Sequence, residues 1–538
     1  MNTPAWLKKV PMGAWMVLLL GTYGIYYGYQ NLIPLEPQSL HSWRQSDCAS
    51  WSWNYYKGSA NFFEGEMNNR LGNGTGQVLT ELPIIYYAVG MLWRVFGHHP
   101  WMYRLLTILL VYAGLYCLHR TVWVLLKDKF WALTIPLLVY SAPVLAFFTN
   151  AFIPDPVALS FAFMGWYGLV SHIQTGKMSQ FWWGMAGFLM SILLKASMAV
   201  SFITVLSLFM MEWIPGIKLL LGRKHEVLFK GKKWIYLLGF LGVGLLSYGW
   251  YVYATWYSTR FEHPHFSGII RDFFSAEAEH RDWMIRTFFA ELLDFLYHPT
   301  IHYLIWGLAA ILVLRIGRPP MSAFWVCLLL ILGQIAYTLL FFQLMLIHQY
   351  YHIVNLMAPT ALFILGAWLM LTYLPRVSAS PIFRFLWLGF LFFNLYHAKM
   401  KIQRYYYDKP EHYKQAAAFY DEGLENWLDS IGLTEDQTVI SMPDPSPNQT
   451  LYLMRRKGWS SFNNPNHTAQ IVRLLVVHED LDYILINDTT LLNDPVLQPA
   501  LREPLGSFKG LHAFKAVQWE DEEPKKEEDV PRGTSSKE

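Results

Sequence analysis

Charged residues are scarce in this chain. Only 15% of its 538 residues are Asp, Glu, Lys or Arg, whereas soluble domains carry about 25%. Three cysteines in 538 residues exclude a fold held together by a framework of disulfides. The net charge of +3 is almost neutral, so nothing indicates nucleic acid as a partner. The GxxxxGK[ST] pattern of a phosphate-binding loop is also missing.

Hydrophobic residues are abundant instead, at 54% of the chain. This composition predicts an α-helical polytopic membrane protein, in which each span needs about 20 predominantly apolar residues. Residues 84–97 are apolar but short for a crossing, which favours a re-entrant or interfacial helix. We predict eleven spans, near residues 12–30, 101–122, 130–149, 157–173, 180–195, 197–214, 234–256, 299–315, 322–346, 353–374 and 381–398.

The positions of Lys and Arg predict which side of the membrane each loop faces, because cytoplasmic loops carry an excess of both. With the N-terminus inside, the inner loops collect the cations and contain few acids, such as Asp128 and Glu226. Counting residues 84–97 as a span would move Lys127 and Lys129 to the outer face, against this rule. The first apolar segment lacks a small-residue cleavage site and is expected to stay as an anchor.

Most of the remaining mass then falls on the outer face, in loops 31–100 and 258–298 and in the C-terminal region. Within loop 258–298, a helical face formed by Met284, Phe288, Leu292 and Phe295 predicts a helix lying in the membrane interface.

The C-terminal region is expected to contain a small α/β domain. Its expected elements are helices at 411–430 and 467–479 and strands at Thr438–Met442 and Tyr483–Asn487. The last residues are almost free of apolar side chains and are expected to be disordered. We therefore predict a membrane catalytic domain at 1–400, an outer α/β domain at 401–519 and a disordered tail at 520–538.

The first outer loop opens with Ser42-Trp43-Arg44-Gln45-Ser46-Asp47 and continues into an aromatic run. Asp47 lies within reach of water but near the low dielectric of the membrane, which suits a general base, although it could equally be a structural partner of Arg44. Trp51 and Trp53 are interpreted as an interfacial aromatic belt.

Other polar residues are expected at the same face. Glu81-Leu82-Pro83 precedes the short apolar segment, and Arg104 opens the second span. Asp155 ends the loop after the third span and could instead cap the following helix. Lys195 lies at a tight outer turn, where it either extends to lipid phosphate or pairs with an anion.

Two further segments of the predicted outer face carry hydrogen-bond donors or candidate metal ligands. The turn His348-Gln349-Tyr350-Tyr351-His352 could bind a phosphate or a sugar, or its tyrosines could belong to an aromatic belt. His263 and His265, with Glu81, are weak candidates for a divalent metal ion, because the His-Pro-His spacing lacks the i, i+4 pattern of helical zinc ligands.

The order of these segments resembles the membrane glycosyltransferases of the GT-C superfamily, in particular the branch of protein O-mannosyltransferases and lipid A aminoarabinose transferases (glycosyltransferase family 39 and its relatives). The Trp43-Arg44-Gln45-Ser46-Asp47 run carries most of the resemblance, because it is similar to a WRQ-A-D run of bacterial members. The resemblance covers about residues 10 to 400 and implies a GT-C-like fold with a long first outer loop.

The resemblance also implies a function: inverting transfer of a sugar from a polyprenyl-phosphate carrier to a lipid, glycan or protein acceptor at the outer, periplasmic face of a bacterial inner membrane. It implies that Asp47 is the catalytic base. The expected substrate-binding residues are Arg44, Glu81, Arg104, Asp155, Lys195, His348, Tyr350 and Tyr351.

One position departs from the family pattern. Aminoarabinose transferases tend to have Lys, and protein mannosyltransferases His, between the acid and the prolines, whereas this chain has Leu82 and a single proline. The donor phosphate then needs other cations, such as Arg104 or Lys195, and neither relative's substrate can be transferred to this chain.

Two other classes of protein fit parts of the pattern. A transporter or flippase for a lipid-linked sugar predicts ionisable residues near mid-bilayer and two related halves, which the sequence does not show. A non-catalytic scaffold would place no constraint on Asp47, Glu81 or Asp155.

Overall fold

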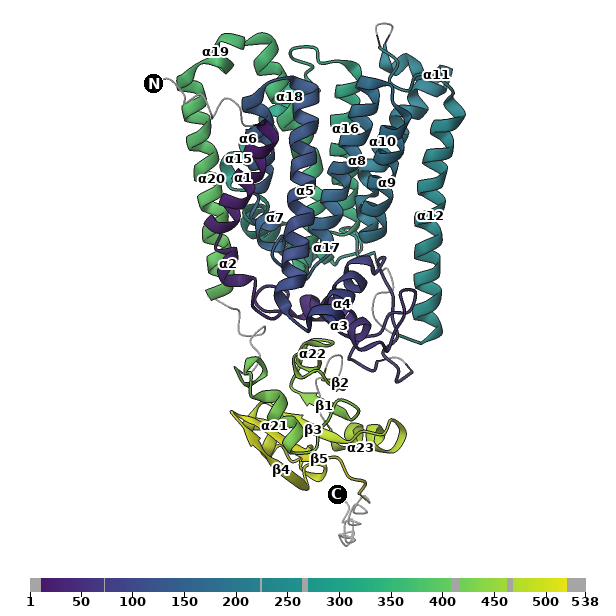
Figure 1. The fold of residues 1–538 in the computed structure, drawn as a ribbon, viewed down its shortest axis with the longest axis vertical. Helices are drawn as coiled ribbons and strands as arrows, with labels where there is room; N and C mark the ends of the chain where they lie inside the picture. The colour runs from purple at the N-terminus through teal and green to yellow at the C-terminus, as the bar shows by residue number, and fades with distance from the viewer. Residues whose placement is uncertain are drawn as a thin grey trace, which may run out of the picture. The chain divides into compact units, whose positions relative to one another are not determined.

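A computed structural model describes residues 11–71, 73–222, 225–263, 270–407, 417–461 and 468–519. The chain forms two compact units (Figure 1). The first comprises Met1–Met67 and Leu71–Lys414, and the second comprises Asn68–Arg70 and Gln415–Glu538. Three residues of the first outer loop therefore belong to the second unit.

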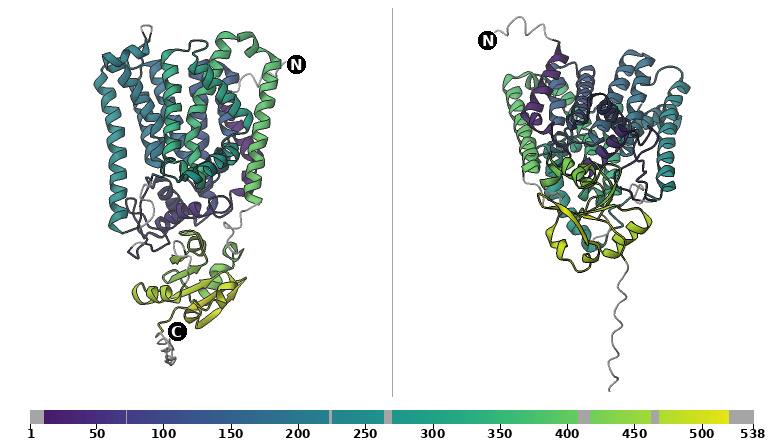
Figure 2. Two further views of the ribbon diagram at one scale, coloured as in Figure 1. Left: turned by 180° about the vertical axis from the view of Figure 1, so that it is seen from behind. Right: turned by 60° about the horizontal axis from the view of Figure 1, so that its bottom comes forward.

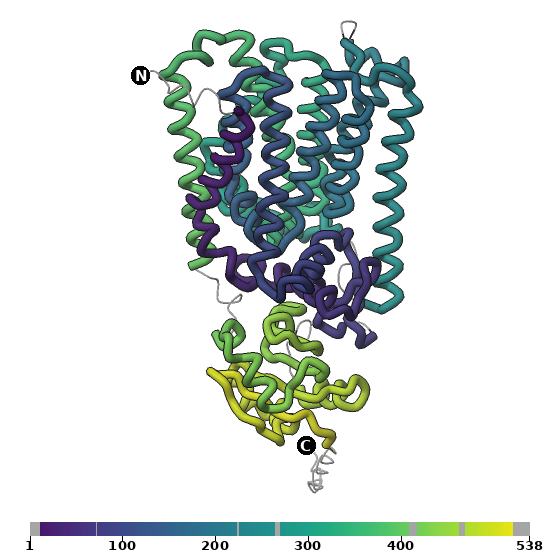
Figure 3. The backbone as a smooth tube through the Cα atoms, viewed as in Figure 1, coloured from purple at the N-terminus to yellow at the C-terminus, as the bar shows by residue number. Residues whose placement is uncertain are grey.

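The first unit is helical, and its long helices run side by side (Figures 1 and 3). Among the described residues, six helical segments are long and apolar enough to cross a membrane on their own. They are α5 (Pro100–Leu126), α8 (Asp155–Thr175), α10 (Ala199–Trp213) with the short turn before it, α12 (Lys233–Arg260), α16 (Met321–Leu340), and α18 (Met357–Tyr373) with the turn before it.

Helices also occupy the other five predicted spans. They are α1 (Met12–Tyr26), α6 (Lys129–Tyr140) with α7 (Pro143–Phe148), α9 (Met178–Leu194), α15 (Pro299–Val313) and α20 (Pro381–Tyr407). The membrane-protein fold is confirmed. Against the eleven predicted spans, six helices of the described residues, or seven if the bent helix pair ending in α15 is one span, are long and apolar enough to cross a membrane. One reason is local: α6 stops before Pro143, because a proline disfavours helical backbone in the residue before it.

The predicted helical face in loop 258–298 is present. α13 (Ala278–Thr287), a π-helical turn (Phe288–Leu292) and α14 (Leu293–Leu296) form one helix, which bends by 97° into α15. Met284, Leu292 and Phe295 are buried, and the ring of Phe288 lies 5.2 Å from that of Phe342 in α17 (Phe342–Ile347). The apolar face therefore packs against protein.

The first outer loop contains two packed helices, α3 (Ser42–Lys57) and α4 (Ile84–Phe96), and α4 is short, as its sequence predicted. Gly90 allows this contact, because a Cβ there would lie 2.7 Å from the Cβ of Tyr55. Trp51 is buried and stacks on Tyr86, with ring centroids 5.1 Å apart. Trp53 is buried too, so the interpretation of both tryptophans as an interfacial belt was wrong: they form the core of this loop.

Three hydrogen bonds to backbone groups fix the segment that carries Glu81. The amide of Leu82 donates to the carbonyl of Leu193 at 2.8 Å, the Trp250 indole donates to the carbonyl of Thr80 at 3.1 Å, and the Leu79 amide donates to the Ser258 hydroxyl at 3.0 Å. Trp250 and Ser258 belong to α12, which stands at the edge of the helical unit in every view (Figure 2). The segment is thus held by α12 and by the end of α9.

The second unit contains a five-stranded mixed sheet in the order β2-β1-β3-β5-β4. β1 is parallel to β2 and β3, whereas β5 is antiparallel to β3 and β4. The bounds are β1 (Thr438–Met442), β2 (Lys457–Ser460), β3 (Tyr483–Ile486), β4 (Glu503–Phe508), β5 (Leu511–Lys515), α21 (Leu424–Ser430), α22 (Gln449–Met454) and α23 (Ala469–His478).

The two predicted strands of this unit are present as β1 and β3, and the helix predicted at 467–479 is α23. The helix predicted at 411–430 is shorter: a 3₁₀ turn at Ala417–Tyr420 precedes α21, and 411–416 lie outside the described residues. The disorder predicted for 520–538 also falls outside them.

Residues Asn68–Arg70 of the first loop extend the β2 edge of this sheet. The Arg70 amide donates to the carbonyl of Gly458 at 2.7 Å, and the Gly458 amide donates to the carbonyl of Asn68 at 3.0 Å. The Asn68 side chain donates to the carbonyl of Arg456 at 3.0 Å. These bonds explain why three loop residues belong to the second unit.

Candidate active site

Two ion pairs bring together four of the predicted site residues. The guanidinium of Arg44 in α3 lies 2.6 Å from the carboxylate of Glu81. The ammonium of Lys195, in the turn after α9, lies 2.9 Å from the carboxylate of Asp155, the first residue of α8. The least buried of these side chains, that of Lys195, is only 18% exposed, so both pairs are largely shielded from water.

Glu81 is surrounded by donors. Besides Arg44, the hydroxyls of Thr80 and Tyr86 donate to its two carboxylate oxygens. Burial raises the pKa of Glu81, but Arg44 and the two hydroxyls outweigh that effect and hold the pKa below its ordinary value. Glu81 is therefore a carboxylate at neutral pH.

Lys195 pairs with a protein anion rather than extending to lipid phosphate. Its ammonium also lies 4.0 Å from the ring centre of Tyr351 and 5.2 Å from that of Tyr350. The backbone brings the two ion pairs together: the amide of Leu82, next to Glu81, donates to the carbonyl of Leu193, two residues before Lys195, at 2.8 Å. The two pairs therefore form one polar cluster.

Asp155 does not cap its helix in the way the sequence allowed. The N-cap residue of α8 is Pro154, and Asp155 is the first helical residue. Its carboxylate instead forms an ion pair with the ammonium of Lys195.

The predicted turn at 348–352 lies against the start of α3. Gln349 hydrogen-bonds the imidazole of His41, whose ring meets that of Tyr350 edge-on at 5.1 Å. The rings of His348 and Trp43 lie 5.3 Å apart. Burial, the largest cause, lowers the pKa of His348 well below its ordinary value, so its ring is neutral. This ring lies 5.5 Å from that of Tyr351, which faces the Lys195 ammonium.

Asp47 is 0% exposed, so the prediction that it lies within reach of water was wrong: packing around α3 covers its carboxylate. It lies on α3 one turn after Arg44. The helical spacing of three residues places these two side chains on neighbouring parts of one face. The largely buried α3 therefore carries both the acid expected to be the base and a cation of the cluster.

Arg104 has a different environment from the one predicted. It is 0% exposed, and its guanidinium donates to three backbone carbonyls, those of Leu35 at 3.0 Å, Glu36 at 3.1 Å and Asn150. Its guanidinium also lies 4.6 Å from the ring centre of Phe152. The structure does not place Arg104 in either ion pair, and its contacts indicate that it holds two loops in position rather than binding phosphate.

In the described residues, the structure adds no ligand to the candidate metal site of Glu81, His263 and His265. His263 is buried and its amide donates to the carbonyl of Ser258, whereas His265 lies outside the described residues. Within the described part of the chain, no three His, Cys, Asp or Glu side chains converge as a metal site.

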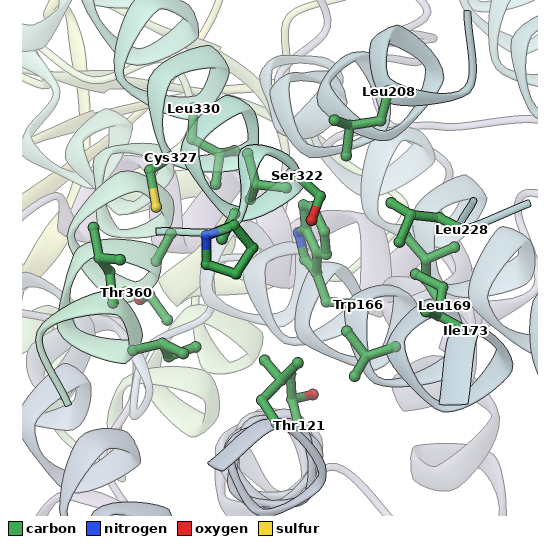
Figure 4. Close-up of a pocket in the computed structure, with 18 of the residues that line it drawn as sticks. Thr121, Trp166, Leu169, Ile173, Leu208, Leu228, Ser322, Cys327, Leu330 and Thr360 are labelled. Atoms are coloured by element: carbon green, nitrogen blue, oxygen red, sulfur yellow. The ribbon is translucent and has the colours of Figure 1, made fainter. Parts of the chain in front are cut away.

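An apolar cavity of about 420 Å³ lies among α5, α8, α10, α16 and α18. In Figure 4, Cys327 and Thr360 lie across the cavity from Leu169 and Ile173. The polar lining residues Gln174, Glu226 and Ser322 belong to the ends or loops of these segments that are predicted to face the cytoplasm. Such a lining suits a hydrocarbon chain.

His41 was missed by the sequence analysis. Its backbone has φ 56°, in the left-handed region, and it forms the N-cap of α3. A non-glycine residue in this region carries strain that the surrounding contacts must overcome. Its position before Trp43-Arg44-Gln45 was the only available signal, because a single histidine in a loop has no pattern of its own.

Comparisons with known proteins agree with the fold. The structure resembles ArnT of Cupriavidus metallidurans (TM-score 0.57, 12% identity, 93% of this chain and 98% of that chain). It also resembles the arabinofuranosyltransferase AftD of mycobacteria (0.55, 12%, 94% and 40%) and the oligosaccharyltransferase of Archaeoglobus fulgidus (0.51, 11%, 90% and 70%). No protein-family model and no curated protein matches the sequence.

All three similar structures are GT-C glycosyltransferases. The chain therefore has the GT-C fold, which confirms the predicted fold class. At 11 to 12% identity this likeness concerns the fold.

Proposed function

We propose that this protein is an inverting glycosyltransferase that moves a sugar from a polyprenyl-phosphate carrier to an acceptor hydroxyl. The observation that carries the proposal is the polar cluster: Arg44, Glu81, Asp155 and Lys195 come from separate segments of a GT-C fold and form two shielded ion pairs. Charged groups inside a membrane protein are costly, so such a concentration of them favours a substrate site.

In the proposed reaction, the carboxylate base and the cations have different roles. The acceptor oxygen attacks the anomeric carbon from the face opposite the phosphate, the new C–O bond forms, and the bond from the anomeric carbon to the phosphate oxygen breaks. The proton of the acceptor hydroxyl passes to Asp47, and the bonding electrons leave with the polyprenyl phosphate. A positioned carboxylate base and fixed cations near the leaving group lower the barrier of such a step.

Arg44 and Lys195 are the proposed phosphate partners. A guanidinium carries five N–H donors and an ammonium three, so each can bind phosphate oxygens while it keeps its carboxylate partner. Glu81 and Asp155 then orient the two cations, and either can accept a hydrogen bond from a sugar hydroxyl. This assignment replaces Arg104, whose guanidinium donates to three backbone carbonyls.

The orientation of the chain, the kind of membrane and the class of acceptor are proposed from the sequence. The excess of Lys and Arg in the predicted inner loops favours a cytoplasmic N-terminus and a periplasmic C-terminus. The Trp43-Arg44-Gln45-Ser46-Asp47 run favours a bacterial inner membrane. The acceptor is a lipid, a glycan or a protein.

The direct test uses the purified full-length protein in lipid nanodiscs. We expect it to release undecaprenyl phosphate from at least one of glucosyl-, mannosyl- and arabinofuranosyl-phosphoryl-undecaprenol when membrane lipids and glycans are supplied as acceptors. NMR of the product should show an anomeric configuration opposite to that of the donor. Movement of the intact donor between leaflets without cleavage would instead support a flippase and contradict the proposal.

A further inference from the structure

A row of aromatic rings begins at the Lys195 ammonium. Tyr351 comes first, with its ring centre 4.0 Å from the ammonium nitrogen. The ring of His348 lies 5.5 Å from that of Tyr351, and the ring of Trp43 lies 5.3 Å from that of His348. All three side chains are partly exposed, although the ring of Tyr351 is also stacked on that of Tyr350, 5.2 Å away.

Trp43 differs from the other tryptophans of α3. Trp51 is 2% exposed and Trp53 is 8% exposed, and both pack inside the first loop. Trp43, one residue before the cation that pairs with Glu81, is only partly covered. Packing of the loop core therefore explains Trp51 and Trp53, whereas a large aromatic side chain at Trp43 requires a further reason.

The row is held firmly in place. His41 lies behind it, with its ring 6.0 Å from Trp43 and 5.1 Å from Tyr350. Its imidazole is hydrogen-bonded to the Gln349 side chain, which ties the start of α3 to the turn that carries His348 and Tyr351. The left-handed backbone of His41 shows that the contacts here are strong enough to maintain a strained conformation.

We propose that Trp43, His348 and Tyr351 form the surface on which the sugar ring of the lipid-linked donor lies. The inference rests on the proposed function, in which Lys195 binds the donor phosphate. Because the sugar is bonded directly to that phosphate, its ring must lie beside the cation, and the row starts at the cation and leads away from it. The faces of sugar rings are lined with C–H groups, and they pack on aromatic rings while the hydroxyls turn to polar neighbours.

The polar neighbours of such a ring are present. Asp155 pairs with Lys195, and Glu81 pairs with Arg44 in a segment bonded to the end of α9 just before Lys195. Aromatic rings together with these carboxylates would distinguish the sugar from the polyprenyl chain, which carries no hydroxyl groups. The carrier phosphate and the sugar thus have separate contacts.

Binding experiments can separate these contacts. In nanodiscs, the affinities of Trp43→Phe and Trp43→Leu are measured for undecaprenyl phosphate and for the glycosylated donor that the parent binds most tightly among glucosyl-, mannosyl- and arabinofuranosyl-phosphoryl-undecaprenol. We expect Trp43→Leu to weaken binding of the glycosylated donor about tenfold and Trp43→Phe to weaken it less, since an aromatic face is worth up to that factor. Binding of undecaprenyl phosphate should be unchanged in both.

Trp183→Leu is the matched control, because Trp183 is 58% exposed on α9 and the same change there should affect neither ligand. Equal loss of both ligands in Trp43→Leu, no loss of either, or a parent that binds no glycosylated donor more tightly than undecaprenyl phosphate would overturn the sugar surface. A parent that does not bind undecaprenyl phosphate at all would overturn the proposed function together with it.

Discussion

The ammonium of Lys195 and the carboxylate of Asp155 are joined at 2.9 Å, across the turn after α9 and the first residue of α8. The same ammonium faces the ring of Tyr351. One lysine therefore fixes the relative positions of two helix ends and of the turn that carries the predicted donor contacts. Within the polar cluster, this pair has a structural role as well as the proposed chemical one.

Removing one partner of this pair should lower the stability of the protein. Asp155→Asn leaves an uncompensated ammonium in a shielded site, and we expect the free energy of unfolding to fall by about 3 kcal/mol. Lys195→Met should have a similar cost, and the double variant should lose clearly less than the sum of the two. Chemical denaturation in detergent measures all three.

The pair Lys509–Asp421 is the control, because its lysine side chain is 58% exposed. Lys509→Met should change the free energy of unfolding far less than Lys195→Met does, because water screens an exposed pair. Strict additivity in the Lys195–Asp155 double variant would contradict the coupling of the two residues.

Arg104 is expected to affect folding rather than phosphate binding. Arg104→Gln loses hydrogen bonds to backbone carbonyls that are then left without their donor, and we expect stability to fall by about 2 to 3 kcal/mol. The affinity of the folded fraction for undecaprenyl phosphate should remain within twofold of the parent, whereas Arg44→Gln should weaken it at least tenfold. If Arg104→Gln weakened the affinity for undecaprenyl phosphate more than Arg44→Gln does, Arg104 rather than Arg44 would be the phosphate partner.

The stability of the protein should depend on pH through His41. Burial lowers the pKa of His41 from 6.5 to about 4. Between these values the unfolded chain binds a proton that the folded protein does not, so the free energy of unfolding should decrease as the pH falls from 6.5 to 4, by about 1 kcal/mol per pH unit. Comparison with His41→Gln isolates this contribution, and parallel pH profiles for the two proteins would contradict it.

The second unit contains a buried acid whose role is structural. The carboxylate of Asp444 accepts hydrogen bonds from the amides of Ser446 and Thr450, both at 2.9 Å, and from both hydroxyls at 2.6 Å. Asp444→Ala should lower the free energy of unfolding by about 2 kcal/mol. Asp488 makes a similar but exposed cap to Thr490, and Asp488→Ala should cost less than about 1 kcal/mol. Equal losses of unfolding free energy in the two variants would show that burial of Asp444 adds nothing to stability.

Much of the fold could be predicted from composition and local pattern. Helices occupy every predicted span, because long apolar runs have few alternatives in a membrane. β1 and β3 were recognisable because they are short apolar runs, whereas β4 is largely exposed and carries Pro504 and Gly506, so it lacks that signal. The pairing of Asn68–Arg70 with β2 joins residues far apart in the chain and could not be predicted from either segment alone.

The candidate site was predictable in its residue types but not in its pairings. Arg44, Glu81, Asp155 and Lys195 were identified because each is a charged residue in a predicted outer loop or turn, and because the order of these segments resembles the GT-C family. That Arg44 meets Glu81 and Lys195 meets Asp155 depends on the packing of α3, α8 and α9. Trp51 and Trp53 were misinterpreted for a related reason, because an aromatic run can face lipid or fill a core, and only the packing of α4 decides between them.

The central claim is that the outer polar cluster catalyses sugar transfer with Asp47 as the base. The most direct measurement is the rate of undecaprenyl phosphate release from a glycosylated undecaprenyl-phosphate donor by folded Asp47→Asn protein, beside Asp128→Asn, which changes an acid that caps α6 in a predicted inner loop. We predict that Asp47→Asn lowers the rate at least about 100-fold and that Asp128→Asn leaves it near that of the parent. Transfer by folded Asp47→Asn at the parent rate would contradict the claim.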